Sequence, residues 1–368
     1  MLLYSKMRNW QMAKAPRSSE FKSMKLYADS KLQRLRSVAQ DYVLEEAGPR
    51  VRKGTRLNKR IDEALSGTED GLRMIECREG TGGECGSVWC MKCRGRKQDR
   101  MLKSYYKHID EEALSETEAR ERLRHVTVLH DVVAVFDEGG IIEFEKTISH
   151  VCEVVEDMRN AVKNMKRVWN KRGMKVWMRG GIHLELVDVD LMLFDKAGNH
   201  KAKVLLDWFD KKKVDGRYYD GSAEKAIVVH FHALVDLHDI DEDDFREALN
   251  GRWNDTEQQV HIQRTWTRIG FKDGSKEQSL DDALKGIARY CFTGSNKDLQ
   301  YQKFWGAGRL VFETDIELDD DGKLIAVARE LQVRPTGKRL TASEIRLLVQ
   351  VHNRVAGEAN RGLTIGIY

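Results

Sequence analysis

The sequence has few of the features that mark membrane, secreted or disordered proteins. It contains only 3 prolines, no Gly-, Pro- or Ser-rich tract, and 41% hydrophobic residues over 368 positions, which excludes collagen-like, linker-dominated and wholly disordered chains. The longest apolar run, around 226–235, includes two histidines and is much shorter than the roughly 20 residues of a membrane helix. The opening MLLYSKMRNWQ lacks a signal-peptide apolar core and a small-residue cleavage site. We therefore expect a cytoplasmic protein with reduced cysteines and no membrane partner.

Acidic residues are scarce in two stretches of the chain. Residues 1–60 hold 15 Lys or Arg against 5 Asp or Glu, so they carry a net charge of +10 although the whole chain carries only +4. Residues 159–179 contain no acid, and Trp169 and Trp177 lie among their cations. Cations with interleaved aromatics suit a nucleic-acid backbone whose bases can stack, whereas the alternative is a solvated helix face. The DNA-binding candidates are Lys163, Lys166, Arg167, Lys171, Arg172 and Lys175.

Strand and helix patterns alternate irregularly after the first hundred residues. β-branched or alternating segments predict strands at 125–129, 181–189, 226–237 and 260–269, and a hairpin formed by 310–316 and 324–327 around a turn at 319–322. Apolar residues at helical spacing predict helices at 148–169, 280–292 and 342–356. Without regular βαβ units, this order predicts an α+β fold on a central antiparallel sheet.

Four of the six cysteines lie close together in CREGTGGECGSVWCMKCRGR, at Cys77, Cys85, Cys90 and Cys93. Four thiolates in a glycine-rich polar segment are typical of a closed, structural tetrahedral Zn²⁺ site. Ordinary buried thiols and disulfides are the alternatives, but buried cysteines usually lie in apolar runs. Cys152 and Cys291 do lie in such runs and are predicted to be core residues.

Two histidines share one face of the strand AIVVHFHALV. His230 and His232 are two positions apart, so their imidazoles converge, either on one divalent ion or as a polar pair on a wet sheet face. The strand at 181–189 offers His183 or Glu185 as a third ligand. We prefer Glu185, since a carboxylate with two imidazoles suits Mn²⁺ or Mg²⁺. Tyr290, on the helix at 280–292, is either a core residue or, beside such an ion, a nucleophile that attacks phosphorus.

The order of these features resembles the plasmid rolling-circle replication initiators of the HUH endonuclease superfamily. The resemblance covers about 75–300 and rests on RMIECREGTGGECGSVWCMKCRGRK, the strand with Thr127, GGIHLELV, AIVVHFHALVDL and the later tyrosine. It implies a five-stranded antiparallel sheet with the metal-binding histidines on a central strand. It also implies that Tyr290 nicks one DNA strand, keeps the 5′-phosphate and frees a 3′-hydroxyl to prime synthesis. Relatives often carry a lysine three residues after the tyrosine, where this chain has Thr293, so Lys297 would substitute for it from a different turn.

The resulting prediction is a metal-dependent endonuclease and strand transferase that nicks and rejoins single-stranded or hairpin DNA at a replication origin, aided by host helicase and polymerase. No Gly-x4-Gly-Lys-Ser/Thr motif is present, so no fused helicase is expected. The alternatives are an HUH-type transposase and a non-catalytic zinc-containing DNA-binding regulator. The predicted organisation is a basic helical region at 1–73, a zinc segment at 74–98, the endonuclease domain at 99–310, and a C-terminal hairpin and helix at 311–368.

Overall fold

The computed structural model describes residues 49–138, 141–189, 200–256, 259–265, 279–292, 299, 309–318, 324–333, 339–357 and 363–367. The described residues from Ile61 onward form one compact unit, and those up to Arg60 belong to another. Within the described part of the chain, no helix is both long enough and apolar enough to cross a membrane.

A five-stranded antiparallel sheet organises the unit that begins at Ile61. Its strand order is β6-β1-β5-β4-β9, and each neighbouring pair is antiparallel. The strands are β1 (Leu123–Ala134), β4 (Trp177–Asp188), β5 (Lys225–Asp236), β6 (Val260–Arg264) and β9 (Thr364–Ile367). The predicted mixed α+β class with a central antiparallel sheet is confirmed, and β5, the strand of the two histidines, is its middle strand.

The remaining described elements are helices, one short hairpin and one long hairpin. The helices are α3 (Pro49–Ala64), α4 (Glu69–Glu79), α5 (Met91–Glu111), α6 (Glu116–Arg122), α7 (Phe144–Lys171), α9 (His200–Asp215), α10 (Glu242–Asn250), α11 (Leu280–Tyr290) and α12 (Ala342–Gly357). The hairpins pair β2 (Asp137–Glu138) with β3 (Ile141–Ile142) and β7 (Arg309–Leu318) with β8 (Leu324–Val333). The predicted hairpin after 310 is therefore present with longer strands, and its turn at 319–322 lies outside the described residues.

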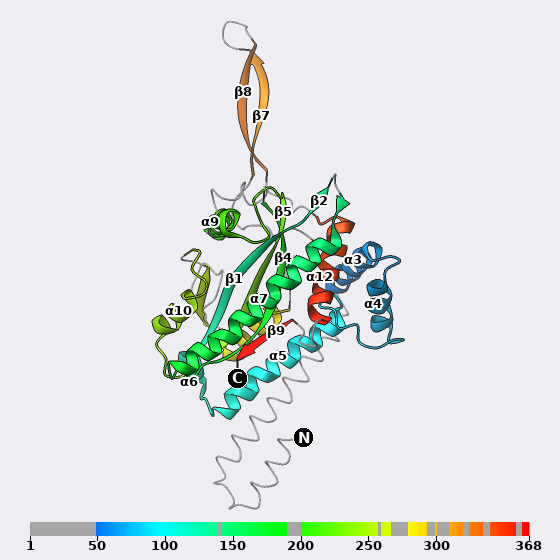
Figure 1. Ribbon diagram of the computed structural model, residues 1–368. Coiled ribbons are helices and arrows are strands. Elements are labelled where there is room, and N and C mark those ends of the chain that lie inside the picture. The colour runs from blue at the N-terminus through cyan, green and yellow to red at the C-terminus, as the bar shows by residue number, and fades with distance from the viewer. Residues whose placement is uncertain are drawn as a thin grey trace, which may run out of the picture. The chain divides into compact units, whose positions relative to one another are not determined.

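Different helices cover the two faces of the sheet. Figure 1 shows α7 lying across one face, and α12 packs against it, with the Arg159 guanidinium donating to the Val355 carbonyl at 3.4 Å. On this face Phe231 contacts Trp253, whose indole donates to His130, and His130 in turn contacts Asp157 of α7. The opposite face carries the even-numbered residues of β5, including both histidines, because side chains alternate along a strand.

Helices α9 and α11 cover the face of the sheet that carries the histidines. At one end α9 buries Trp208 and Phe209 in an apolar cluster with Val187 and Val228 of the sheet. At the other end α11 approaches so closely that a Cβ on Gly181 would lie 2.4 Å from the Cys291 carbonyl oxygen. Only glycine fits there, and this contact brings the end of α11 onto the histidines.

Candidate active site and metal centres

Three histidines from two neighbouring strands meet on the sheet face beneath α11. His183 of β4 lies directly opposite His230 of β5, and its Nδ1 is 2.9 Å from His230 Nε2. One ligand nitrogen from each of His183, His230 and His232 lies within 4.8 Å of the others, and all three residues are buried. Two nitrogens that each bind one ion at about 2.1 Å and at right angles lie about 3.0 Å apart, so this spacing fits a shared cation. The three imidazoles could hold a divalent metal ion.

His232 is oriented by the strand on its other side. Thr127 of β1 is its register partner, and the threonine hydroxyl lies 2.8 Å from His232 Nδ1. This contact directs Nε2 of His232 towards a ligand, in the way that second-shell groups usually fix metal-binding imidazoles. Strand β1, which carries Thr127, therefore helps to orient a candidate metal ligand.

Glu185, which we preferred from the sequence as the third metal ligand, lies outside the group of three imidazoles. It shares a face of β4 with His183 and is 4% exposed, but its register partner is Val228 rather than a histidine. The described ligand group around His230 and His232 includes His183 and does not include Glu185. Sequence spacing alone could not decide between them, because both point to the same face. A three-imidazole set also favours a transition metal such as Zn²⁺ or Mn²⁺ over Mg²⁺, which prefers oxygen ligands.

Tyr290 stands beside the histidines at the end of α11. Its ring centroid is 4.3 Å from that of His232 and 5.8 Å from that of His183. The helix begins at Ser279, whose hydroxyl accepts a hydrogen bond from the Asp282 amide, and buries Leu284 and Ile287. Because that buried stripe fixes its rotation, the last residue, Tyr290, projects over the site and stays 43% exposed.

The surroundings of Tyr290 favour the protonated phenol. Partial burial and the negative charge of Glu185 raise its pKa to about 12. Glu185 therefore lies close enough to act on the phenol electrostatically, although it stands outside the imidazole group. Nucleophilic use of Tyr290 near neutral pH requires positive charge to offset both effects.

His125 is a site residue that sequence reasoning did not single out. It lies on β1 two residues before Thr127, hence on the same face of the sheet. The centroid of its ring is 5.7 Å from that of His232 and 6.2 Å from that of Tyr290. Gln263 of β6 contacts its Nδ1 at 2.7 Å. Burial, with a smaller effect of His261, lowers the pKa of His125 to about 4, so the imidazole is neutral at physiological pH. Only the pairing of β1 with β6 and β5 reveals this neighbourhood.

The four clustered cysteines form a second candidate metal centre. The sulfur of Cys93 lies 3.5 Å from that of Cys77 and 3.6 Å from that of Cys85, and Cys90 lies 3.9 Å from Cys77. Thiolates that bind one Zn²⁺ tetrahedrally at about 2.3 Å are about 3.8 Å apart, so the cluster fits a closed four-thiolate site. The structure confirms that the four cysteines come together and could hold a metal ion.

Helix ends and glycine conformation bring these sulfurs together. Cys77 lies in the last turns of α4, which stops at Gly80 with a φ of 78°, a left-handed conformation that favours glycine. Cys90 is the N-cap of α5 and Cys93 lies in its first turn. The hydrogen bond from Cys85 lowers the pKa of Cys90 to about 5, and the helix N-terminus also favours a thiolate there. The segment is therefore two helix ends with a loop between them.

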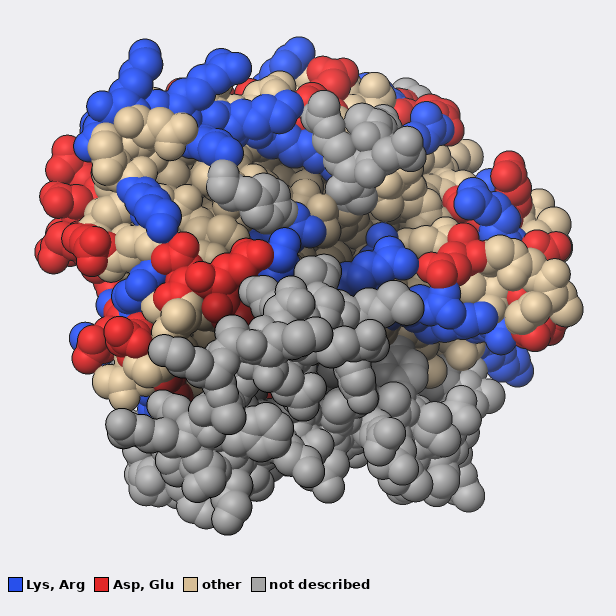
Figure 2. All heavy atoms as spheres, turned by 90° about the horizontal axis from the view of Figure 1, so that it is seen from below, with Lys and Arg blue, Asp and Glu red and all other residues tan. Residues whose placement is uncertain are grey.

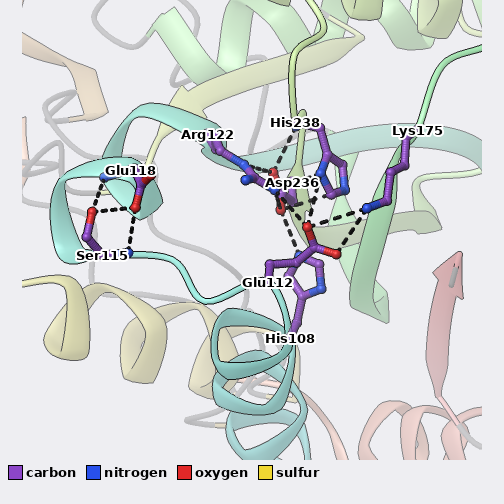
Figure 3. A network of polar contacts seen from close by, with 8 residues as sticks. All are labelled: His108, Glu112, Ser115, Glu118, Arg122, Lys175, Asp236 and His238. Carbon is purple, nitrogen blue, oxygen red and sulfur yellow. Dashed lines mark hydrogen bonds and ion pairs between the residues drawn. The ribbon is translucent and has the colours of Figure 1, made fainter.

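A third polar cluster, shown in Figure 3, is better explained as an ion-pair network. His108, Asp236 and His238 offer ligand atoms within 4.8 Å, but Arg122 donates to both Asp236 oxygens, at 3.0 and 2.7 Å. His108 and the His238 amide also donate to this carboxylate, at 2.8 and 2.9 Å. Its lone pairs are engaged, which leaves little capacity for a metal. The network ties α5 and α6 to the end of β5, beside a cavity of about 760 Å³.

The two tryptophans of the basic stretch pack against other rings of the protein, Trp169 fully buried and Trp177 half-buried. Trp169 is 1% exposed and packs on Phe245 of α10, with ring centroids 5.3 Å apart. Trp177 stacks on His108 at 3.9 Å with an interplanar angle of 4°. Lys163, Arg167 and Lys171 lie on α7, which covers the face of the sheet opposite to Tyr290.

The other predicted site residues have separate outcomes. Lys166 lies within α7 and is half-buried, whereas Arg172 and Lys175 follow the end of the helix and are exposed, with Lys175 paired to Glu112 at 3.1 Å. Lys297 lies outside the described residues. Cys152 and Cys291 are buried, as their apolar context predicts.

Comparison with known proteins gives no match to a family model, a curated protein or a solved structure.

Proposed function

We propose that this protein is a metal-dependent, tyrosine-dependent DNA strand transferase that nicks and rejoins single-stranded origin DNA to start rolling-circle replication. One observation carries the proposal: Tyr290, from α11, lies with its ring 4.3 Å from His232 in a group of three buried imidazoles. A buried trio of imidazoles beside a partly exposed phenol suits attack on a phosphate better than it suits a purely structural core.

The chain's own residues supply the nucleophile and its positioning. The Tyr290 hydroxyl releases its proton to water while its oxygen forms a bond to the scissile phosphorus. The bond between phosphorus and the 3′ oxygen breaks, and that oxygen takes a proton from water. Because the bond from Tyr290 to the 5′-phosphate is itself a phosphodiester bond, attack by a 3′-hydroxyl can reverse the step, release the tyrosine and rejoin the strand.

The imidazole group supports this reaction through its ligands and their orientation. His183, His230 and His232 would hold the divalent cation, and Thr127 orients His232. When bound, a cation of this kind stabilises developing charge on a phosphate oxygen as a Lewis acid. Glu185 has the opposite electrostatic effect on Tyr290, since it raises the pKa of the phenol.

The four-cysteine centre is assigned a structural role. A Zn²⁺ held by Cys77, Cys85, Cys90 and Cys93 has no open position, so it would link the end of α4 to the start of α5. Helix α5 in turn packs on α11, where Tyr105 contacts Cys291 at 3.7 Å. In this proposal the zinc centre supports the position of Tyr290 through α5.

A cleavage assay on end-labelled single strands from the native replicon tests the function. With Mn²⁺ we expect a free 3′-hydroxyl product and a denaturant-stable protein–DNA adduct, and Tyr290→Phe should abolish both. Tyr218→Phe is the matched control, because Tyr218 contacts Glu153 and His150 and is not among the residues around His183, His230 and His232. An adduct that persists in Tyr290→Phe, or cleavage without any adduct, would contradict the proposal.

A further inference from the structure

A basic stripe on the outer face of α7 has no place in the chemistry of Tyr290. We define the α7 stripe as six exposed residues that share one face of the helix: Asn160, Lys163, Asn164, Arg167, Val168 and Lys171. Their spacing of three or four residues lines them up along the helix. The stripe contains three cations, two amides and no acid.

The cations of the stripe are not neutralised by carboxylates. Lys163 and Arg167 contact the side-chain oxygens of Asn160 and Asn164, each at 3.3 Å. Among the residues that the structure describes, no carboxylate forms an ion pair with Lys163, Arg167 or Lys171. These positive charges therefore remain available to an external anion.

The acids on the earlier half of the same helix are already engaged. Asp157 contacts His130 at 3.1 Å and Arg252 at 2.8 Å, and Glu153 pairs with Arg217 at 3.3 Å. The charge of α7 is thus divided along its length, with paired acids first and the cations of the stripe after them. Figure 2, which views the protein from below, shows Lys and Arg side chains gathered along its upper edge.

The stripe lacks the aromatic groups that single-stranded nucleic acid needs. Proteins that bind single strands combine a basic groove with aromatic rings on which bases stack. Trp169, the tryptophan within this part of α7, is 1% exposed, and Trp177 is stacked on His108. Apart from the side chain of Val168, the stripe presents charged and amide groups, which suit a regular line of phosphates.

We infer that the α7 stripe is a docking surface for the phosphate backbone of duplex DNA, separate from the strand that Tyr290 would cut. The cations from Lys163 to Lys171 span about 12 Å of helix. A duplex presents roughly seven phosphates over that length, a far denser line of charge than a flexible single strand. Because α7 and α11 cover opposite faces of the sheet, duplex DNA on the stripe leaves the histidine face accessible.

The test measures duplex binding in a Tyr290→Phe background, so its result does not depend on cleavage. Lys163→Gln, Arg167→Gln and Lys171→Gln are combined, and anisotropy is recorded on a blunt duplex and on one of its single strands at about 50 to 200 mM salt. We expect about tenfold or more weaker duplex binding and a logarithmic salt slope smaller by about 2 to 3. Single-strand binding should change by less than about threefold.

Two control variants distinguish loss of the stripe's charges from a general loss of positive charge and from misfolding. Lys103→Gln, Lys107→Gln and Lys213→Gln remove three positive charges whose partners are Asp99, Glu111 and Asp210, and they should leave the slope unchanged. The charge-conserving Lys163→Arg, Arg167→Lys and Lys171→Arg variant should keep wild-type duplex binding. The inference is overturned by an unchanged slope in the stripe variant, by an equal loss in the paired-lysine control, or by an equal loss on single strands.

Discussion

The ring of Tyr290 stands edge-on to that of His232, with centroids 4.3 Å apart and an interplanar angle of 75°. The two residues come from a surface helix and from the middle strand of the sheet, and the close approach of Cys291 to Gly181 holds them together. A partly exposed phenol is thereby kept beside three buried imidazoles.

The first prediction concerns the third metal ligand. His183→Ala should weaken Mn²⁺ or Zn²⁺ binding about as much as His230→Ala, by tenfold or more, because each removes one of three nitrogens. Glu185→Gln should weaken it by much less. Isothermal titration of the metal-free variants checks this, and a larger loss in Glu185→Gln than in His183→Ala would return the ligand role to the carboxylate.

Much of the fold was predictable because hydrophobic periodicity is strong in the central elements. The helix expected at 148–169 is α7, and the strands expected at 181–189 and 226–237 are β4 and β5. The sequence did not indicate α9 or β9, since β9 has only four residues and is defined by its pairing with β4. The role of β9 as the edge strand shows that part of the expected C-terminal region contributes to the central sheet.

The residue types of the candidate site were predictable from the sequence, but the residues that face one another across neighbouring strands were not. His230 and His232 lie on one face of the sheet because side chains alternate along a strand, and their spacing of two residues shows this from the sequence alone. The choice between His183 and Glu185 depends on strand register, which places His183 opposite His230. Trp169 is not available for base stacking because it lies on the buried side of an amphipathic helix and packs on Phe245 of α10.

The second prediction concerns the protonation of Tyr290. Since the charge of Glu185 helps to raise the phenol pKa to about 12, Glu185→Gln should lower it towards the ordinary value of about 10. The variant should therefore form phenolate at lower pH than the wild type does. Carbon-13 NMR of labelled tyrosine in metal-free protein, with Tyr290→Phe for assignment, checks this, and an unchanged or higher titration midpoint would disprove it.

The third prediction concerns removal of zinc. A chelator should lower the melting temperature, because metal binding to four thiolates contributes directly to folding. Cys93→Ser should give the same loss and retain about one zinc less per chain than the wild type, whereas Cys152→Ser, at a thiol outside the cluster, should retain as much zinc as the wild type. Metal analysis after dialysis provides the readout, and a wild-type protein without zinc would refute the assignment.

The fourth prediction concerns the network around Asp236. Burial alone would raise the pKa of this carboxyl, but hydrogen bonds from His108 and Arg122 lower it well below its usual range. Arg122→Met leaves a fully buried carboxylate without its guanidinium and should cost about 3 kcal/mol of unfolding free energy. Arg120→Met, which breaks an exposed pair with Glu116, should cost less than about 1 kcal/mol.

The sign of the pH effect at Asp236 follows from its lowered pKa. A depressed carboxyl pKa stabilises the folded state above the unfolded value of about 4, and this contribution is lost as pH falls below it. Denaturant melts from neutral to acidic pH should therefore show a steeper loss in the wild type than in Arg122→Met. Parallel curves for the two proteins would contradict the assigned role of Arg122.

The fifth prediction tests the central claim, that Tyr290 and the three histidines act on one phosphate. After incubation with single-stranded origin DNA and Mn²⁺, protease digestion and mass spectrometry should find the 5′-phosphate on the peptide that contains Tyr290. The His183→Ala protein should give little or none of that peptide. A phosphate on any other residue, or an undiminished Tyr290 adduct without His183, would contradict the account.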